Sequence, residues 1–286
     1  QYEQMYEELP ADKVQAEGPQ FVGDACGENL GEQGAPSEVP CERPIGMRFD
    51  FIEICGGAAG VTKELVKEGV SCGPVLDLSV SKQFDISEHR VIQWVVFMLE
   101  EDRLETFLVS PPCTSFSPAA HPCVRSYKEP RGFDQQNWKV RIGNLLAFAA
   151  LTFLFVAYRM QKSGLGETPR RSKMRWLEEW KRLIALGAEE VFLAGCMYGS
   201  VHQKEFCFLG VNMHVKLLHL RCSRDHQHIR IQGKYTKMSA IYCEGLCRAL
   251  AVFFRDHILA KRRAGDRKST RLNSSHVSES RMPSSA

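Results

Sequence analysis

Hydrophobic and polar positions between residues 47 and 260 follow two different periods, and each period predicts a type of element. Short runs rich in β-branched and aromatic residues predict strands over residues 48–55, 74–77, 106–109, 190–193 and 205–211. Longer stretches with helical spacing predict helices over residues 61–69, 88–101, 142–161 and 173–186. Strands separated by helix-length segments are typical of a doubly wound, Rossmann-like α/β fold, in which helices cover both faces of a parallel sheet.

The two ends of the chain lack such periods. Residues 1–46 hold ten acids and two bases, a net charge of −8, and are rich in Gly, Pro, Glu and Gln, which predicts a disordered acidic arm or linker. Residues 261–286 hold seven bases and two acids, a net charge of +5, and are rich in Ser and Arg. This predicts a disordered basic tail, of which residues 268–286 resemble translated cloning sequence.

Composition narrows the class of protein further. Hydrophobic residues at 44% and charged residues at 25% are ordinary for a globular protein. The longest uncharged apolar run, residues 145–157, has 13 residues, which predicts a buried helix and no membrane partner. The 11 cysteines lack the paired spacings of a disulfide scaffold, so we expect reduced thiols and an intracellular location. The +6 charge of residues 47–260 tolerates a polyanionic partner without requiring one.

A glycine-rich turn follows the first predicted strand. Residues 56–60 (GGAAG) lead into a predicted helix, so the backbone can approach a ligand beside free amide groups. Asp77 lies 17 residues after Gly60, near the offset at which an acid binds a ribose, and Asp85 is placed to face an adenine. Alone, the turn could be a connector and each acid a surface or capping residue; together they favour a nucleotide-like ligand.

Residues 108–117 (LVSPPCTSFS) are the most informative stretch. Two prolines after a strand stiffen the backbone and fix the direction of the next side chain, the thiol of Cys113. A cysteine held in this way can act as a nucleophile, although most cysteines in proteins are buried structural residues.

These motifs, in this order, resemble those of the cytosine-5 DNA methyltransferases. Residues 111–117 resemble the nucleophile motif, residues 53–60 the S-adenosylmethionine motif, and residues 166–169 (GETP) the motif with the catalytic glutamate. Residues 198–203 (YGSVHQ) resemble a segment that in the family precedes two arginines; Glu205 and Cys207 stand in those two places. The resemblance covers residues 48–255 and leaves no room for the family's recognition domain. In these proportions the chain resembles the methylase-like segments of retroelement polyproteins, so we expect it to be a fragment of such a polyprotein.

The resemblance implies a role for each matching residue. It implies that residues 47–260 form a methyltransferase-like catalytic domain. It implies Cys113 and Glu167 as catalytic residues, a cofactor site formed by Ile54, Cys55, Gly57, Gly60, Asp77, Asp85, Ile86 and Pro112, and a substrate site formed by Ser117, Arg125, Arg131 and Gln203.

The same resemblance implies the reaction. The Cys113 thiolate would attack carbon 6 of a flipped-out cytosine, Glu167 would hold the ring nitrogen and the exocyclic amine, and carbon 5 would take a methyl group from S-adenosylmethionine. The expected partner is nucleic acid, with DNA favoured over RNA, and the expected location is the nucleus. Two alternatives remain open: a catalytically degenerate relative that binds cofactor or nucleic acid, and an RNA cytosine-5 methyltransferase.

The sequence also contains a loose group of metal-ligand residue types. Cys222, His226, His228, Cys243 and Cys247 lie close together in the chain, but none of their spacings matches a Cys-x2-Cys zinc motif. Cys243 and Cys247 have helical spacing and fit a core face better. The sequence therefore predicts no metal site.

Overall fold

The computed structural model describes residues 47–231 and 240–278, with side chains up to residue 264. The predicted arm at residues 1–46 lies outside the described residues. Five strands form one sheet in the order β1-β2-β3-β5-β4, and their bounds are Phe49–Ile54 (β1), Leu104–Val109 (β2), Ser163–Pro169 (β3), Glu189–Ala194 (β4) and Glu205–Val211 (β5).

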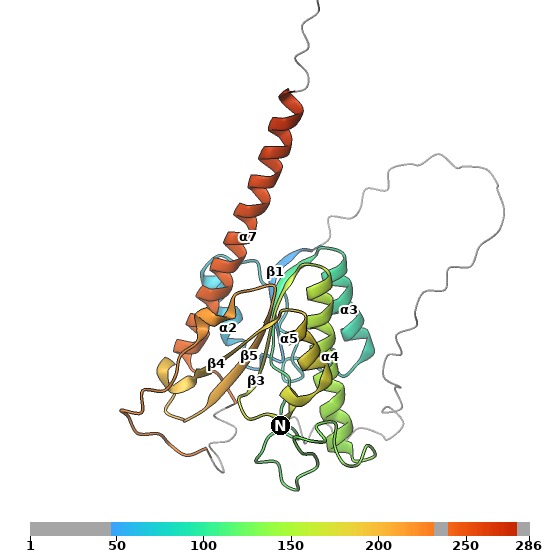
Figure 1. Cartoon of the computed structure of the whole chain (residues 1–286), viewed down its shortest axis with the longest axis vertical. Coiled ribbons are helices and arrows are strands. Elements are labelled where there is room, and N and C mark those ends of the chain that lie inside the picture. The colour runs from blue at the N-terminus through green and yellow to red at the C-terminus, as the bar shows by residue number, and fades with distance from the viewer. Residues whose placement is uncertain (1–46, 232–239, 279–286) are drawn as a thin grey trace, which may run out of the picture. The chain divides into compact units, whose positions relative to one another are not determined.

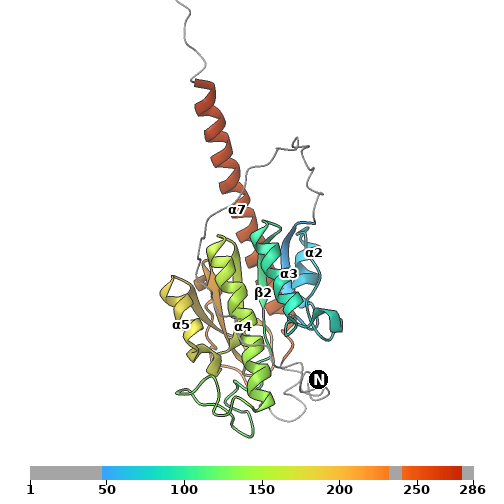
Figure 2. The ribbon, with the colours of Figure 1, turned by 90° about the vertical axis from the view of Figure 1, so that its right-hand side faces the viewer.

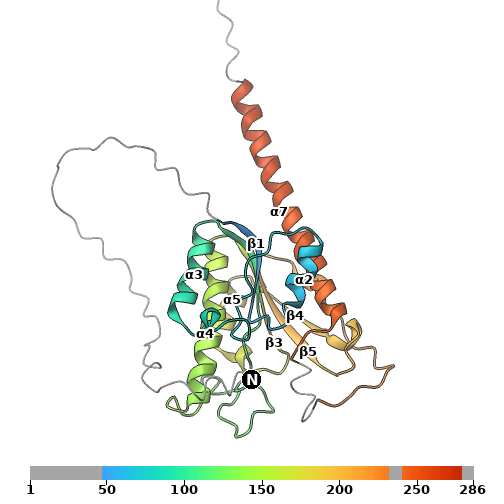
Figure 3. The same cartoon turned by 180° about the vertical axis from the view of Figure 1, so that it is seen from behind.

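Helices cover both faces of this sheet, as Figures 1 and 2 show. On one face lie α3 (His89–Glu100), α4 (Trp138–Arg159) and α5 (Glu178–Ala185), which contact one another in that order. On the other face α2 (Gly60–Lys67) packs against α7 (Glu244–Ser278), as is visible from behind in Figure 3. The predicted doubly wound α/β class is confirmed.

The core follows from this layering. On the face of α2 and α7, the buried side chains of Phe51, Leu108 and Leu165 lie in one cluster with Leu65 and Phe254 of the covering helices. On the opposite face, α4 buries eleven of its residues against the sheet and its neighbouring helices. By length and composition α4 could cross a membrane, but here it is the buried core helix that the sequence predicts.

The direction of one strand differs from the prediction of a parallel sheet. Strands β1, β2 and β3 are parallel, whereas β5 runs antiparallel to both β3 and β4. The ten residues between β4 and β5 hold only the short 3-10 helix η4 (Gly195–Tyr198). So short a connection favours an antiparallel pair, because a parallel crossover needs a dozen residues or more.

Strand β3 was missed by the sequence analysis because its sequence, SGLGETP, has little β propensity. Its two glycines have a packing role in the centre of the sheet. A Cβ atom at Gly164 would lie 2.5 Å from Cζ of Phe107, and one at Gly166 would lie 2.9 Å from Cδ1 of Leu154. Large side chains from β2 and α4 therefore occupy the space that a β-branched residue would need.

Three further predictions need correction. Residues 74–77 do not form a strand; the chain makes only isolated bridges from Cys72 and Leu76 to β1, because Pro74 cannot donate to a ladder. The helix predicted over residues 173–186 is divided into η3 (Lys173–Trp176) and α5 by the extended Leu177. Helix α7 continues to Ser278, through residues predicted as a disordered tail, since no proline interrupts its propagation.

Two short 3-10 helices complete the described structure. They are η2 (Lys82–Phe84), which lies between Asp77 and Asp85, and η5 (Val215–Leu218), which follows β5. The strand register then sets the site: Ile54 pairs with Val109, and Val109 pairs with Gly166. The residues that come next on each strand therefore share the carboxyl edge of the parallel part of the sheet, where ligands bind in this fold class.

Candidate active site

Cys113 lies just beyond β2, and rigid backbone fixes its side chain. The chain leaves β2 through Ser110, whose amide donates to the Ile54 carbonyl at 3.0 Å, and then through two prolines. The Cys113 thiol donates to the Pro111 carbonyl oxygen, with 3.3 Å between the two atoms, and Sγ lies 3.0 Å from Oγ1 of Thr168 in β3. The thiol is partly exposed and faces the strand that carries the predicted glutamate.

Glu167 in β3 is buried, with 7% of its surface exposed. Its Oε1 atom has no hydrogen-bond partner among the residues that the structure describes. Burial raises the pKa of Glu167, while the charge of Lys204 and a hydrogen bond with Tyr242 lower it. A carboxyl group in this position is favoured in its protonated form, which can donate as well as accept a hydrogen bond.

The two groups influence one another electrostatically. The pKa of Cys113 is raised to about 12, chiefly by burial and then by the negative charge that Glu167 carries when ionised, against the opposing effects of the Thr168 and Ser172 hydroxyls and the charge of Lys204. The free protein therefore holds Cys113 as a thiol. A ligand that neutralises Glu167 would remove one cause of the raised pKa and favour the thiolate.

Positive charge reaches this edge from two residues that the sequence analysis did not assign. Lys204, whose charge lowers the pKa of both Cys113 and Glu167, lies with Nζ 4.6 Å from the Phe206 ring centroid. Arg170, at the end of β3, pairs with Glu205 at 2.7 Å. Glu205 stands where the family that the sequence resembles has an arginine. This acid was the signal in the sequence that a basic residue nearby would pair with it.

The glycine turn after β1 is held open by backbone in the left-handed region. Cys55, Gly57 and Ala59 have φ values of 57°, 48° and 57°. The Gly57 amide donates to Oδ2 of the buried Asp77 at 2.8 Å, and the Cys55 amide donates to the Leu76 carbonyl at 2.7 Å. The structure thus brings the glycine turn and the first predicted acid together.

A second acid, Glu53, explains why the turn needs glycine at position 56. Its carboxylate accepts from the backbone amide of Thr62 at 2.9 Å and from the Thr62 hydroxyl at 2.7 Å, which caps the start of α2. A Cβ atom at Gly56 would lie 2.5 Å from Cγ of Glu53. Sequence analysis did not single out Glu53, although an acid directly before a glycine turn is a signal for a helix-capping role.

Gly60 has a packing role in the structure. A Cβ atom there would lie 2.5 Å from Sγ of Cys247 in α7, so Gly60 lets α2 and α7 approach closely. Its predicted place in the cofactor site stays a prediction.

The remaining predicted cofactor residues lie around the same turn. Asp85 is buried, and its Oδ1 accepts from the Ser87 amide at 2.9 Å; Ile86 is buried beside it. Burial raises the pKa of Cys55, and the charges of Asp77, Asp85 and Cys113 raise it further. The negative charges of Asp77 and Asp85 therefore both reach the turn that carries the Cys55 thiol. An acidic edge beside a glycine turn fits a nucleoside cofactor with a positive charge.

Arg125 does not contact solvent in this structure, and its predicted role in binding substrate stays a prediction. It is fully buried, with Nη1 donating to Asn144 Oδ1 at 2.8 Å and Nη2 donating to Ser115 Oγ at 2.9 Å. Its guanidinium carbon lies 3.8 Å from the Phe116 ring centroid. Arg125 ties the loop at residues 117–137 to α4, so it positions this loop from inside.

Three other predicted substrate residues have accessible positions but different surroundings. Arg131 is exposed and pairs with Glu179 of α5. Ser117 is partly exposed, and its carbonyl accepts from Nζ of Lys173 at 3.1 Å. Gln203 is exposed next to Lys204. The substrate roles of these residues, and the roles of Ile54 and Pro112 beside the cofactor, stay predictions.

Comparison with known proteins gives distant matches. No protein-family model and no curated protein matches the sequence. Among solved structures, the chain is similar to the Entamoeba histolytica methyltransferase EhMeth, with 12% identity over 64% of this chain and 57% of that one and a TM-score of 0.38. It is also similar to the Dnmt2 methyltransferase of S. pombe (14% identity, 64% of this chain, 58% of that chain, TM-score 0.32).

A third match is a putative DNA modification methyltransferase encoded within a prophage of E. coli, with 13% identity over 57% of this chain and 46% of that chain and a TM-score of 0.32. The chain spans less than two thirds of the length of each of these proteins. These likenesses are distant, and the fold class rests on the sheet order and register.

Proposed function

We propose that this chain transfers a methyl group to carbon 5 of cytosine in DNA, with S-adenosylmethionine as the cofactor. The observation that carries the proposal is the buried, unpartnered Oε1 of Glu167, next in β3 to Thr168, which contacts the partly exposed Cys113 thiol. A buried carboxyl oxygen without a partner costs about 1–3 kcal/mol, and a bound ligand with a complementary polar group would remove that cost.

The cofactor would lie along the turn at residues 55–59, near Asp77 and Asp85. When bound, S-adenosylmethionine supplies a methyl group on a positively charged sulfur. The two acids have an electrostatic effect on Cys55 at the centre of this turn, so they favour a cation there. The left-handed backbone at Cys55 and Gly57 keeps the turn clear of side chains that would fill this space.

Cys113 would act as the nucleophile. Addition of its sulfur to carbon 6 breaks the ring double bond and makes carbon 5 an enamine-type nucleophile. After carbon 5 is methylated, loss of its proton and departure of the same sulfur restore the double bond. The thiol is regenerated, and the net products besides 5-methylcytosine are S-adenosylhomocysteine, which remains when the sulfonium gives up its methyl group, and one proton.

Glu167 would hold the cytosine ring. Its protonated carboxyl group can donate to the ring nitrogen N3 while its other oxygen accepts from the exocyclic amine. This pairing supplies a proton where negative charge develops when sulfur adds to carbon 6.

The loop at residues 117–137 would lie over the base. Arg125 anchors it from inside, which leaves Arg131 and Lys128, both exposed, to contact phosphate oxygens. A cytosine inside a duplex cannot reach a thiol at the edge of a sheet, so the base must be flipped out or single-stranded.

The test is transfer of labelled methyl groups from S-adenosylmethionine to separate pools of DNA and RNA by the full chain, followed by nucleoside analysis. The expected product is 5-methylcytosine in DNA, made by the wild type and by the Cys72→Ser control beside β1 and absent with Cys113→Ala. Label in RNA alone would instead assign an RNA substrate. Cofactor binding by calorimetry without transfer to either pool would identify a catalytically degenerate relative.

A further inference from the structure

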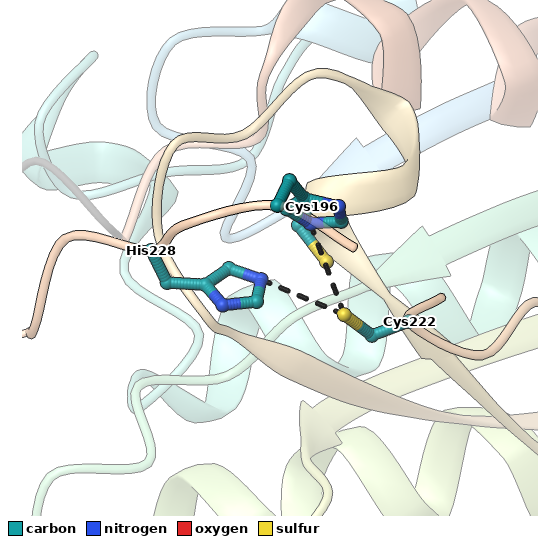
Figure 4. Close-up of side chains that lie close together, drawn as sticks. Cys196, Cys222 and His228 are labelled. Carbon is teal, nitrogen blue, oxygen red and sulfur yellow. Dashed lines mark hydrogen bonds between the residues drawn. The ribbon is translucent and has the colours of Figure 1, made fainter. Parts of the chain in front are cut away.

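Four potential metal ligands come together away from the proposed active site. Cys196 belongs to η4, directly after β4, while Cys222, His226 and His228 lie in the segment that follows η5. Their ligand atoms, two sulfurs and two ring nitrogens, all lie within 4.8 Å of one another. Figure 4 shows Cys196, Cys222 and His228 pointing toward one another from these two segments.

We propose that these four side chains bind a structural zinc ion. Sγ of Cys222 lies 3.8 Å from Nε2 of His226 and 3.6 Å from Nε2 of His228. Zinc bond lengths of about 2.3 Å to sulfur and about 2.0–2.1 Å to nitrogen, at tetrahedral angles, place a thiolate and an imidazole nitrogen about 3.5 Å apart. The observed spacing therefore fits a tetrahedral centre with only small movements.

The surroundings of the ligands support this arrangement. Nδ1 of His226 contacts Oδ1 of Asp225 at 2.8 Å, which leaves Nε2 of the same ring directed at the cluster. A carboxylate on the other ring nitrogen is the usual partner of a zinc-binding histidine. The amide of Arg224, whose φ is 65°, donates to Sγ of Cys222 at 3.4 Å, as a backbone amide does for a thiolate ligand.

The segment has few other contacts to hold it. It is attached at its start by the bridge between Leu193 and Leu220, and at its end by the bridge between His202 and Ile229. Between these bridges no residue is buried, and most side chains are exposed. A metal that crosslinks Cys196 to the residues 222–228 would supply the stability that burial does not.

The ligand set favours zinc and a structural role. Two thiolates and two imidazoles close all four tetrahedral positions, so no site remains for substrate or water. The ion would fix the start of the segment at residues 195–204, which ends at Lys204, the cation that acts on Cys113 and Glu167. The proposed metal centre thus supports the active site without joining it.

The sequence analysis predicted no metal because the fourth ligand is remote. Cys196 precedes Cys222 by 26 residues, and only the pairing of β4 with the segment at Leu220 brings them together. Cys243 and Cys247 do not join: Sγ of Cys243 lies 3.3 Å from the Tyr198 carbonyl oxygen, and Cys247 packs on Gly60.

The test is the metal content of the full chain, expressed with added zinc and purified under reducing conditions. Mass spectrometry of metals should find one zinc per chain in the wild type and less than about a tenth of that in Cys222→Ser and in His228→Asn. The matched controls Cys123→Ser and His219→Asn change exposed residues outside the cluster and should retain the zinc of the wild type.

A second measurement decides the matter if the ligand variants fail to fold. Wild-type protein reconstituted with cobalt should show the visible bands of a tetrahedral ion and a thiolate-to-cobalt charge-transfer band. A wild-type protein that holds neither metal after reconstitution would overturn the proposal, and so would a Cys222→Ser variant that keeps its zinc. A disulfide between Cys196 and Cys222 that persists in protein purified under reducing conditions would overturn it as well. None of these readings depends on methyl transfer, so they are independent of the proposed function.

Discussion

The two edges of the central sheet treat their charged groups in opposite ways. At the amino edge, Lys162 donates to Asp102 and, at 2.9 Å, to Glu105, and Lys261 pairs with Glu105 from α7. At the carboxyl edge, Glu167 keeps a buried oxygen without a partner among the described residues. The charged groups around Lys162 therefore pair within the chain, whereas Glu167 keeps hydrogen-bonding capacity that the described chain does not use.

The pKa shifts have opposite signs at the two edges. Burial tends to raise the pKa of Glu105, but hydrogen bonds from Lys261 and Lys162 lower it overall, so its charged form is stabilised. Burial raises the pKa of both Glu167 and Cys113, so their charged forms are destabilised. Groups of the first kind stabilise the fold, whereas groups of the second kind are typical of sites that act on a ligand.

Replacing Cys113 with serine should have the largest effect at the carboxyl edge. The change keeps a similar size and polarity, but a hydroxyl at this place is a far weaker nucleophile than a thiolate. Methyl transfer should fall by at least about 10³-fold, while the unfolding midpoint in urea stays close to that of the wild type.

A covalent complex gives the decisive readout for that variant. DNA with 5-fluorocytosine should trap the wild type, because fluorine at carbon 5 cannot leave as a proton does, and the Cys72→Ser control should be trapped equally. Trapping of Cys113→Ser at the wild-type level would show that another residue attacks the base.

Replacing Glu167 with glutamine should separate activity from stability. The amide cannot donate a proton to N3 in the same way, so methyl transfer should fall by about 10²–10⁴-fold. The same change replaces a buried carboxyl group that can ionise with an amide that cannot, so the folded protein should gain stability over the wild type above pH 4.5.

The pH dependence of that gain has a definite sign. The folded protein holds the Glu167 proton above the ordinary pKa of 4.5, where the unfolded chain has lost it, so wild-type stability falls as the pH rises from 4.5. The advantage of Glu167→Gln should therefore grow in urea unfolding as the pH rises above 4.5. An advantage that shrinks over this range would mean that Glu167 is ionised and paired.

Replacing Lys162 with methionine probes the opposite edge. It leaves the carboxylate of Glu105, whose side chain is only 15% exposed, with Lys261 and the more distant Arg48 at 4.0 Å as its remaining cations, so stability should fall by about 2 kcal/mol. Because Asp102 is largely exposed, its lost pairing contributes little. The folded fraction of Lys162→Met should transfer methyl groups at the wild-type rate. A loss of transfer without a loss of stability would contradict the assignment of Lys162 to stability alone.

Much of the parallel half of the sheet could be predicted from the sequence. The run FDFIEI has strong β propensity, and the helices that became α3 and α4 have long apolar periods. Strand β3 could not be predicted, because its glycines are set by Phe107 and Leu154, which lie far away in the chain. β propensity is read from the local sequence and does not depend on residues that pack against the strand from other elements.

The same limit applies to the site residues. The position of Cys113 follows from local chemistry, a strand and two prolines, and the structure places it beside the strand of Glu167 as predicted. The burial of Arg125 depends instead on Asn144 and Ser115, whose positions only the folded loop defines. A basic residue in a loop predicts a phosphate contact until its neighbours are known.

The smallest predicted effect is a pH response at the amino edge. Burial lowers the pKa of His257 to about 4, the charge of Lys261 lowers it further, and Nε2 lies 2.7 Å from Oγ of Ser163. Between pH 6.5 and pH 4 the unfolded chain binds a proton that the folded protein excludes, so wild-type stability falls as the pH falls. The variant His257→Gln can still bond Ser163 but cannot titrate, so its stability should fall by about 1 kcal/mol less over this window in urea unfolding. The exposed control His219→Gln should keep the wild-type slope, and an unchanged slope in His257→Gln would assign the acid sensitivity to other groups.

Because the response of Glu167 has the opposite sign above pH 4.5, the two variants together test whether the two edges respond to pH in opposite directions.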